Sequence, residues 1–284
     1  INKDMSKLTI YCMAFHNKVL QEIKKVGYVP VGLGPDNYSN EWIRDNTLDN
    51  ISSKNRYYGE YTFYYWFWKN ILNEIKDGTW IGFSGYRYHW SQKSELKSEE
   101  ISDLIDKDNF ENYILKKIPD KWKNYDVILG EKIPVNNWKF SKIFKHAKKK
   151  FLLNPSYFIK KNQNIKLHFD VFHGDGYLDK AITALDPKER KDFKDFINKN
   201  YSFNRENLFF CKSNKLFKDY FNSIFNWLEA CESFFGFDLE GYAKTRIYAF
   251  LAERYLSYWF NKYSKPLDWP IFFFDTNINK IQLK

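Results

Sequence analysis

One segment of the sequence carries so many aromatic side chains that it must be buried on more than one side. Residues 60–70 read EYTFYYWFWKN, and the pattern continues to about Lys76. Apolar side chains recur along it at the spacing of an α-helix, at Tyr61, Tyr64, Tyr65, Trp68, Leu72 and Ile75. Because nearly every side of such a helix is apolar, we expect other parts of the fold to cover more than one of its faces.

Short apolar runs of strand length recur along the rest of the chain. A continuous run of this kind is typical of a strand buried in the middle of a sheet. The runs lie at residues 8–15, 28–32, 80–84, 125–129 and 207–211. Residues 165–170 alternate between apolar and polar side chains, which predicts an exposed or edge strand.

Helical patterns separate these runs. Long amphipathic helices are expected at about 213–235 and 240–263, and the charged, lysine-rich residues 91–124 are expected to form surface helices. Strands and helices in this order predict an α/β fold with a mostly parallel or mixed central sheet flanked by helices. The even spread of aromatic residues indicates a single domain over residues 1–265, followed by a partly frayed C-terminal tail at 266–284.

The composition argues against several classes of protein. Cys12, Cys211 and Cys231 are too scattered for a disulfide framework or a zinc site. The glycine spacings of a Rossmann dinucleotide site and of a P-loop kinase are absent. No apolar run approaches the ~20 residues needed to cross a bilayer, and the first residues carry no signal-peptide pattern. We therefore expect a soluble, cytoplasmic protein.

The formal net charge of +10 points to an anionic partner without identifying it. Nine lysines and no acidic residue lie in residues 139–166, interleaved with apolar and aromatic side chains. Such a segment suits peripheral contact with an anionic membrane surface, and an ordinary solvated surface helix is the alternative. No helix-turn-helix, zinc-finger or RNA-recognition pattern is present, so we expect no nucleic-acid partner.

A polar loop precedes the aromatic helix, and an arginine follows the next strand. The loop at residues 45–52 reads DNTLDNIS, and its short polar side chains favour turns, so it can present polar groups outward. Arg87 follows the strand at 80–84, and open α/β sheets bind ligands at such carboxyl ends. An arginine there can hold phosphate oxygens in pairs, and a surface ion pair is the alternative.

Residues 168–176, HFDVFHGDG, hold a second group of candidate residues. As a strand they would place His168 and Asp170 on one face, with His173 and Asp175 on the turn beyond. These side chains could bind a divalent ion or supply a general base. A polar turn with no catalytic duty is the alternative.

Charged residues also mark the last long helix and the start of the aromatic one. Arg246 and Glu253 are seven residues apart and nearly aligned on one helix face, with Arg254 next to them. They serve either donor binding or an ion-pair network that braces the fold. Glu60 lies in the first turn of the aromatic helix, where surrounding rings would raise its pKa and suit a base.

These segments together resemble the DUF4422 family of bacterial capsular and exopolysaccharide glycosyltransferases. The hallmark of the family runs D-N-T-G-D-N-I-S-x-K-N, E-x-x-x-x-Y-W-x-W-K-N and H-Y-R-R-Y-F. Residues 45–55 and 60–70 keep the first two parts nearly intact. In the third part, Arg87 matches the first arginine, whereas Gly85 replaces the histidine and Tyr88 the second arginine. The resemblance spans roughly residues 8–263.

The resemblance implies a GT-A-like domain that moves a sugar from a nucleotide-diphosphate donor, first of all UDP-galactofuranose. The acceptor would be a hydroxyl of a growing capsular or surface polysaccharide, as a glycan or lipid-linked glycan, at the inner face of the membrane. The donor-binding candidates are His16, Lys18, Asp45, Asn46, Asp49, Asn50, Lys54, Arg87, Arg246, Glu253 and Arg254. The catalytic candidates are His173, Asp170, Asp175 and Glu60.

No Asp-x-Asp metal motif directly follows the strand before Arg87. Either arginine and lysine replace the metal, or carboxylates elsewhere bind Mn or Mg. In both cases we expect Arg87, Asp45, Asp49 and His173 to share one cavity at the rim of the sheet. The rival functions are a non-catalytic carbohydrate- or lipid-binding module and a transferase of another activated group. Exposed rings on a flat face would favour the binding module.

Overall fold

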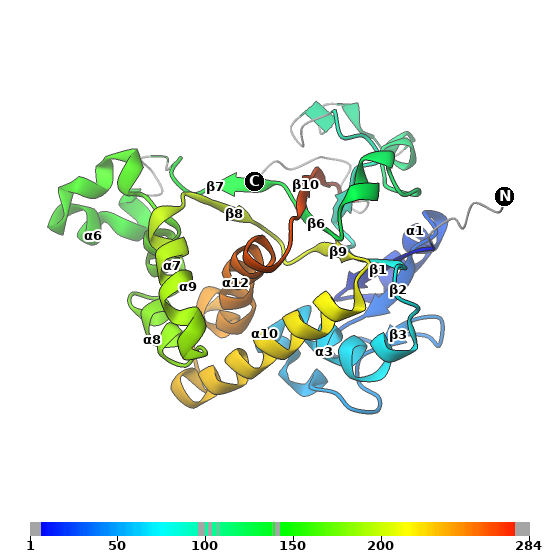
Figure 1. The fold of residues 1–284 in the computed structure, drawn as a ribbon, viewed down its shortest axis with the longest axis horizontal. Coiled ribbons are helices and arrows are strands. Elements are labelled where there is room, and N and C mark those ends of the chain that lie inside the picture. Colours follow the sequence, from blue (N-terminus) through cyan, green and yellow to red (C-terminus); the bar gives the residue numbers. More distant parts are fainter. Residues whose placement is uncertain are drawn as a thin grey trace.

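The computed structural model describes residues 7–95, 100–101, 104–106, 108–137, 139 and 143–275. A seven-stranded sheet of order β10-β6-β9-β4-β1-β2-β3 forms its centre, with helices packed around it (Figure 1). Its strands are β1 (Leu8–Ala14), β2 (Val29–Gly32), β3 (Ile43–Arg44), β4 (Trp80–Gly85), β6 (Val127–Gly130), β9 (Phe209–Cys211) and β10 (Leu267–Trp269). The predicted α/β fold with a mixed, helix-flanked sheet is confirmed.

One strand makes the sheet mixed. β1 pairs in parallel with β2 and β4, β2 with β3, and β6 with β10. β9 runs antiparallel to both of its neighbours, β4 and β6. The amino end of β9 therefore lies at the edge of the sheet where β1 and β4 end. Open α/β sheets bind ligands at that edge.

The aromatic helix is α3 (Tyr61–Asn70), followed by the short turn η3 (Leu72–Glu74). On one side, Tyr64 packs on Phe83 of β4 with 4.4 Å between ring centroids. On another side, Trp68 stacks on Phe225 of α10 (Asn214–Phe235) at 5.6 Å. The prediction that this helix is buried on more than one face is confirmed, because the sheet and a second helix both cover it.

Shorter elements complete the fold. Two small sheets join β5 (Tyr88–Trp90) to β11 (Ile271–Phe273) and β7 (Lys132–Pro134) to β8 (Ser202–Asn204). The other helices are α1 (Leu20–Lys25), α2 (Asn55–Tyr58), α6 (Lys148–Leu153), α7 (Ile165–His173), α8 (Tyr177–Thr183), α9 (Pro187–Lys199), α11 (Tyr242–Thr245) and α12 (Ile247–Tyr263). Helical turns are η1 (Asn17–Val19), η2 (Ser52–Lys54), η4 (Phe110–Asn112), η5 (Asp120–Asn124), η6 (Ile143–Ala147), η7 (Pro155–Phe158) and η8 (Lys160–Asn162).

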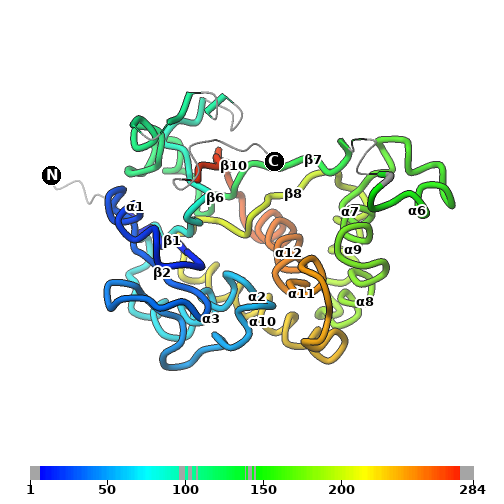
Figure 2. Tube along the Cα trace, turned by 180° about the vertical axis from the view of Figure 1, so that it is seen from behind, coloured from blue at the N-terminus to red at the C-terminus, as the bar shows by residue number. Residues whose placement is uncertain are grey.

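The helices of the second half gather on one side of the sheet. Figure 2 shows α7, α8 and α9 together beyond α12, with α6 outermost. No helix in the described ranges is both long and apolar enough to cross a bilayer.

The strand predicted at residues 165–170 is wrong, because these residues begin α7. Asn164 caps this helix by accepting a hydrogen bond from the Leu167 amide at 2.8 Å. Lys166 and Asp170 form an ion pair at 2.7 Å across one helical turn. The alternation of the sequence is compatible with either element, and the cap and the turn-spaced contacts stabilise the helix.

Other expectations also need adjustment. The helix predicted at 240–263 is divided at Arg246 into α11 and α12. Within residues 91–124, where surface helices were predicted, the described part holds helical residues at 100–101 and 104, the turns η4 and η5, and a bridge between Ser91 and Ile114. Residues 96–99, 102–103 and 107 lie outside the described residues. Leu267–Trp269, placed by the sequence analysis in a tail, form β10 of the central sheet.

Candidate functional site

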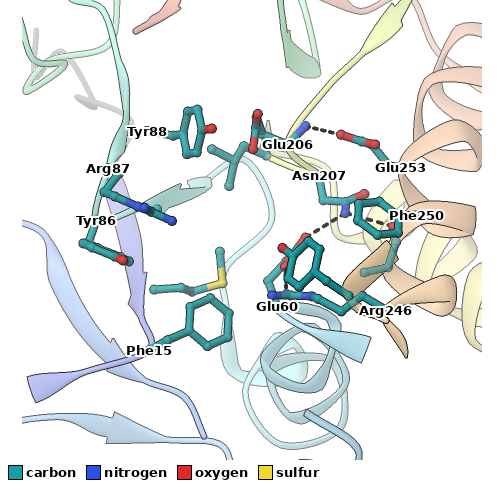
Figure 3. A pocket seen from close by; sticks show the side chains of 15 residues that line it. Phe15, Glu60, Tyr86, Arg87, Tyr88, Glu206, Asn207, Arg246, Phe250 and Glu253 are labelled. Carbon is teal, nitrogen blue, oxygen red and sulfur yellow. Dashed lines mark hydrogen bonds and ion pairs between the residues drawn. The ribbon is translucent and has the colours of Figure 1, made fainter. Parts of the chain in front are cut away.

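A cavity of about 180 Å³ opens at the edge where β1 and β4 end and β9 begins. Its walls come from the ends of these strands, from the start of α3, and from α11 and the first half of α12 (Figure 3). The lining residues are Met13, Phe15, Glu60, Gly85, Tyr86, Arg87, Tyr88, Glu206, Asn207, Leu208, Tyr242, Arg246, Ala249, Phe250 and Glu253. Four predicted site residues, Glu60, Arg87, Arg246 and Glu253, thus meet in one cavity.

Arg87 supplies an unpaired positive charge to one wall. Its main chain is fixed because its carbonyl accepts a hydrogen bond from the Phe274 amide at 2.9 Å. Its guanidinium lies 5.0 Å from the ring centroid of Tyr86 and forms no ion pair with any carboxylate of the described residues. Figure 3 shows this side chain across the cavity from Glu60 and Arg246. A guanidinium held in this way is free to bind phosphate oxygens.

Glu60, Asn207 and Arg246 form the opposite wall. The Asn207 amide group donates to Glu60 Oε1 at 2.7 Å, and Arg246 Nη2 lies 3.4 Å from Glu60 Oε2. Arg246 also sits 5.3 Å from the ring centroid of Phe15. Glu60 therefore orients both neighbours, and a base role for it would require the loss of these contacts.

Two further carboxylates, Glu206 and Glu253, lie together at a third side. The Glu206 amide donates to Glu253 Oε1 at 2.8 Å, and Arg254 Nη1 donates to Glu253 Oε2 at 2.6 Å. Burial and the nearby Glu253 raise the pKa of Glu206 to about 7. Burial also raises the pKa of Glu253, against the opposing effect of Arg254. Glu206 is thus a carboxyl group that exchanges its proton near neutral pH, as a general acid or base must.

The backbone that carries Glu206 is strained. Glu206 has φ of 71°, in the left-handed region that side-chain-bearing residues other than Asn and Asp rarely adopt, and the neighbouring Asn207 has φ of 54°. Tyr64 holds this turn in place by donating to the Asn207 carbonyl at 2.8 Å. Such strain persists only where the surroundings enforce it, and it is concentrated at functional sites.

Comparison with known proteins identifies the family of the chain and a solved structure with a similar fold. The family model described as a domain of unknown function, DUF4422, matches residues 9–265. The chain belongs to this family. Among solved structures, the WbbM bifunctional glycosyltransferase has the same fold, with a TM-score of 0.67 at 20% sequence identity. The match covers 94% of this chain and 45% of the WbbM chain, so the chain spans less than half of that protein. No curated protein matches the chain.

The first hallmark segment of the family, residues 45–55, lies outside the cavity. The Trp66 indole of the second segment donates to the Thr47 carbonyl at 2.9 Å, and the Asn70 amide group donates to the Asp49 carbonyl at 2.8 Å. Asn50 closes the loop on itself by donating to the Leu48 carbonyl at 2.8 Å. The two hallmark segments therefore contact each other. The expectation of one cavity shared by four residues is wrong, because Arg87 lines the cavity and Asp45, Asp49 and His173 do not.

The other donor-binding candidates of this loop are also elsewhere. Asp45 is buried, which raises the pKa of its carboxyl, and Asn46 is exposed. Lys54 pairs with Glu232 of α10 at 2.6 Å. The loop was expected to present these groups to a ligand, but its polar atoms mostly serve the packing of the loop against the helices.

His173 and Arg254 lie directly behind the cavity wall. The ring of His173 stacks on Phe250 with 4.0 Å between centroids, and its Nε2 lies 3.3 Å from Arg254 Nη2. With Nδ1 donating to the Ala243 carbonyl, Nε2 accepts from the arginine. Burial, reinforced by Arg254, lowers the pKa of His173 to about 2. His173 is therefore a neutral residue that positions Phe250 and Arg254, and it does not reach the cavity.

Asp170 and Asp175 are engaged in ion pairs away from the cavity. Asp170 is buried in α7 and pairs with Lys166 at 2.7 Å and Lys150 at 3.3 Å. Asp175 pairs with the same Lys150. The helix in place of the predicted strand explains this, because it directs Asp170 toward the lysines that flank it.

His16 and Lys18 lie near the cavity without lining it. The ring of His16 packs edge-on against the lining residue Tyr86 at 4.7 Å, and His16 Nδ1 accepts a hydrogen bond from the Lys18 amide at 3.3 Å. Lys18 is exposed.

Sequence reasoning missed Glu206 and Asn207 as site residues. The available signal was a polar pair one residue before the buried strand 209–211. A parallel strand would send that pair to the far edge of the sheet, and only the antiparallel direction of β9 brings it to the cavity. Within the described ranges, no group of three His, Cys, Asp or Glu residues is arranged to hold a metal ion.

Proposed function

We propose that the protein is a glycosyltransferase that moves one sugar from a nucleotide-diphosphate donor to a hydroxyl of a capsular or related surface polysaccharide. The observation that carries the proposal is the cavity in which Arg87 faces the carboxylates of Glu60, Glu206 and Glu253 at the ligand-binding edge of the sheet. The fold shared with WbbM supports the same class of reaction. UDP-galactofuranose is the first donor to test. We also propose that the domain has the GT-A architecture.

Arg87 is assigned to the diphosphate. The leaving diphosphate gains negative charge as its bond to the sugar breaks, and a fixed guanidinium stabilises that charge. The amino ends of α3 and α12, at Glu60 and Arg246, line the same cavity and add the positive end of two helix dipoles.

Glu206 is assigned to the acceptor. In the transfer step a bond forms between the acceptor oxygen and the anomeric carbon, while the bond from that carbon to the diphosphate oxygen breaks and its electron pair leaves with the nucleotide. The acceptor hydroxyl loses its proton to the Glu206 carboxylate. A pKa of about 7 suits this role, because the carboxylate is available near neutral pH and is still basic enough to accept a proton.

The distribution of aromatic rings favours an enzyme over a flat binding surface. Large rings such as those of Trp80, Trp90, Trp122 and Trp227 are fully buried. A binding module that stacks sugars on exposed rings would keep them at the surface. Transfer of another activated group to the same glycan remains the second enzymatic candidate, since the same cationic wall would bind its phosphate.

The decisive experiment is a screen of UDP-, GDP- and CDP-sugars for hydrolysis or transfer by mass spectrometry. It is run with and without Mn and Mg, since a divalent cation and the arginines are alternative ways to neutralise the diphosphate. We expect Arg87→Ala to abolish turnover with the active donor while changing the melting temperature little.

Arg56→Ala is the matched control, because Arg56 is also exposed and lies 5.9 Å from the ring centroid of Tyr57. It should keep wild-type turnover. A large drop in the melting temperature of Arg87→Ala would instead identify Arg87 as a structural residue and remove the basis of the proposal.

A further inference from the structure

Residues 143–162 form a small unit at the outer end of the molecule. It consists of η6, α6, η7 and η8, which precede α7 along the chain. Figures 1 and 2 both show α6 at the periphery, beyond α7. Ile143, Ala147 and Phe151 pack with Leu167 of α7 in a cluster separate from the main core. The unit thus has its own minimal core and is attached to the body through α7.

Four large apolar side chains of this unit point into solvent. Leu152 is 64% exposed, Leu153 77%, Phe158 42% and Ile159 51%. They follow one another within eight residues, at the end of α6 and the end of η7. Large apolar side chains grouped at one place on a surface mark an interaction site, whereas single exposed ones are ordinary.

Lysines flank these side chains along the sequence. Lys149 precedes the exposed leucines, and Lys160 and Lys161 follow Ile159; all are exposed and none is paired with a carboxylate of the described residues. Lys150 differs, because it turns inward to Asp170 and Asp175 and fastens the unit to the α7 region. No acidic residue occurs anywhere in residues 139–166. The exposed segment therefore combines large apolar side chains with lysines that have no carboxylate partner among the described residues.

We propose that this face docks on an anionic lipid bilayer. Leu152, Leu153, Phe158 and Ile159 enter the interfacial layer, and Lys149, Lys160 and Lys161 contact the lipid phosphates. Anionic headgroups above an apolar layer match both features of the face. Single-stranded nucleic acid matches only the charge, since it is bound by aromatic stacking and offers aliphatic side chains no partner. The proposal is independent of the transfer reaction, because it concerns a surface outside the cavity.

The test is cosedimentation of the whole protein with vesicles of phosphatidylcholine alone or mixed with phosphatidylserine. We expect binding to the mixed vesicles that weakens as salt is added, and little binding to phosphatidylcholine alone. Leu152→Gln combined with Leu153→Gln should weaken binding about tenfold. Leu48→Gln is its control, because Leu48 is 78% exposed but lies far from the unit in sequence, in the loop beside α3.

Two charge-reversal variants distinguish the effect of the lysines in this unit from the effect of the net charge of the protein. Reversal of Lys149, Lys160 and Lys161 to Glu should abolish the preference for phosphatidylserine. Reversal of the exposed Lys191, Lys194 and Lys218 to Glu changes the net charge equally and should preserve it. Far-ultraviolet circular dichroism verifies that each variant is folded.

Three results would overturn the proposal. The first is that the wild-type protein does not sediment with the mixed vesicles. The second is that both triple lysine variants lose binding equally. The third is that the double leucine variant binds no more weakly than Leu48→Gln. If vesicles are not bound but a labelled single-stranded oligonucleotide is, and only the first lysine triple abolishes that binding, the face is a nucleic-acid site.

Discussion

Glu206 combines two features that each destabilise the folded protein. Its main chain lies in the left-handed region, and its carboxyl is held where its charged form is unfavourable. Both persist because neighbours on three elements fix the turn, through Glu253, Tyr64 and Tyr88. A residue of this kind is expected where chemistry, not stability, determines the side chain.

We predict that Glu206→Gln lowers kcat/KM about 10²- to 10⁴-fold, because the proton acceptor is lost. The wild-type rate should rise with pH through a pKa near 7, as the carboxylate forms. Glu229→Gln, at an exposed site on α10, should leave both the rate and its pH profile unchanged. A Glu206→Gln enzyme with a normal rate would exclude Glu206 as the base.

The same substitution should affect stability in a pH-dependent way. The pKa of Glu206 rises from 4.5 when unfolded to about 7 when folded, so the folded state binds more protons between these values. Stability contributed by this group therefore falls as pH rises from about 4.5 to about 7. Glu206→Gln should raise the melting temperature at pH 8 and not at pH 4. Equal changes at both pH values would show that the ionised carboxylate is not the cause.

Leu48 is strained for a different reason. Leu48 adopts φ of 52° with 78% of its surface exposed. Leu48→Gly should therefore raise the free energy of unfolding by about 1 kcal/mol, since it relieves the strain and removes little packing. Leu48→Ala keeps the Cβ atom and should give no such gain. Chemical denaturation of the three proteins measures the difference.

At the scale of elements, the sequence predicts the long helical and apolar segments, but it does not predict how the strands pair with one another. The aromatic helix and the apolar runs of β1, β4 and β6 have a single plausible structure, because their composition leaves no polar face. The segment of α7 fits two periodicities, and the choice depends on the cap at Asn164 and on Lys150, which is distant in sequence. The direction of β9 depends on its neighbours in space, which no local pattern encodes.

The direction of the strands and the neighbours of the loops also explain which site residues were predicted correctly and which were not. Arg87 was found because its strand runs parallel to β1 and ends at the expected edge. Glu206 was missed because β9 is antiparallel. Asp49 was overestimated because its partners on α3 were not considered, and Asn50 because it bonds within its own loop. Short polar side chains that close their own loop have the same sequence as those that bind a ligand.

The β4–β9 pairing itself is testable. A Cβ atom at Gly82 would lie 1.8 Å from Cε1 of Phe210, the residue opposite it on β9. Gly82→Ala should therefore reduce the free energy of unfolding by about 1–3 kcal/mol, as overpacking does. Gly85→Ala, on the same strand, meets nothing closer than 3.8 Å and should change it by about 0.5 kcal/mol or less. Equal effects in urea denaturation would contradict the close approach of the two strands.

At the scale of the whole molecule, the sheet is completed by a distant segment. β10 pairs with β6, and β11 with β5, although more than a hundred residues separate each pair in sequence. The Trp269 indole donates to the Ser91 carbonyl at 2.7 Å and its ring meets Trp122 at 5.4 Å. Ile271, Phe272 and Phe274 are buried as well. The family model ends at residue 265, before these strands.

A chain truncated after residue 265 should therefore not fold cooperatively. It loses four buried apolar side chains, each of which contributes about 1.5–3 kcal/mol to the free energy of unfolding. Their combined contribution is comparable to the usual total stability of a protein, about 5–15 kcal/mol. A chain ending at Asp275 keeps both strands and is the comparison. Thermal unfolding should be cooperative only for the longer chain, and a similar transition in both would mean that β10 and β11 are dispensable.

The late position of β10 has a consequence for biosynthesis. While the ribosome is still translating, β6 and Trp122 have already emerged, but the strand that covers them has not. The nascent chain then presents an open strand edge beside bare tryptophan rings, which invites aggregation and chaperone binding. We expect the newly made protein to remain a chaperone client until residue 273 leaves the exit tunnel.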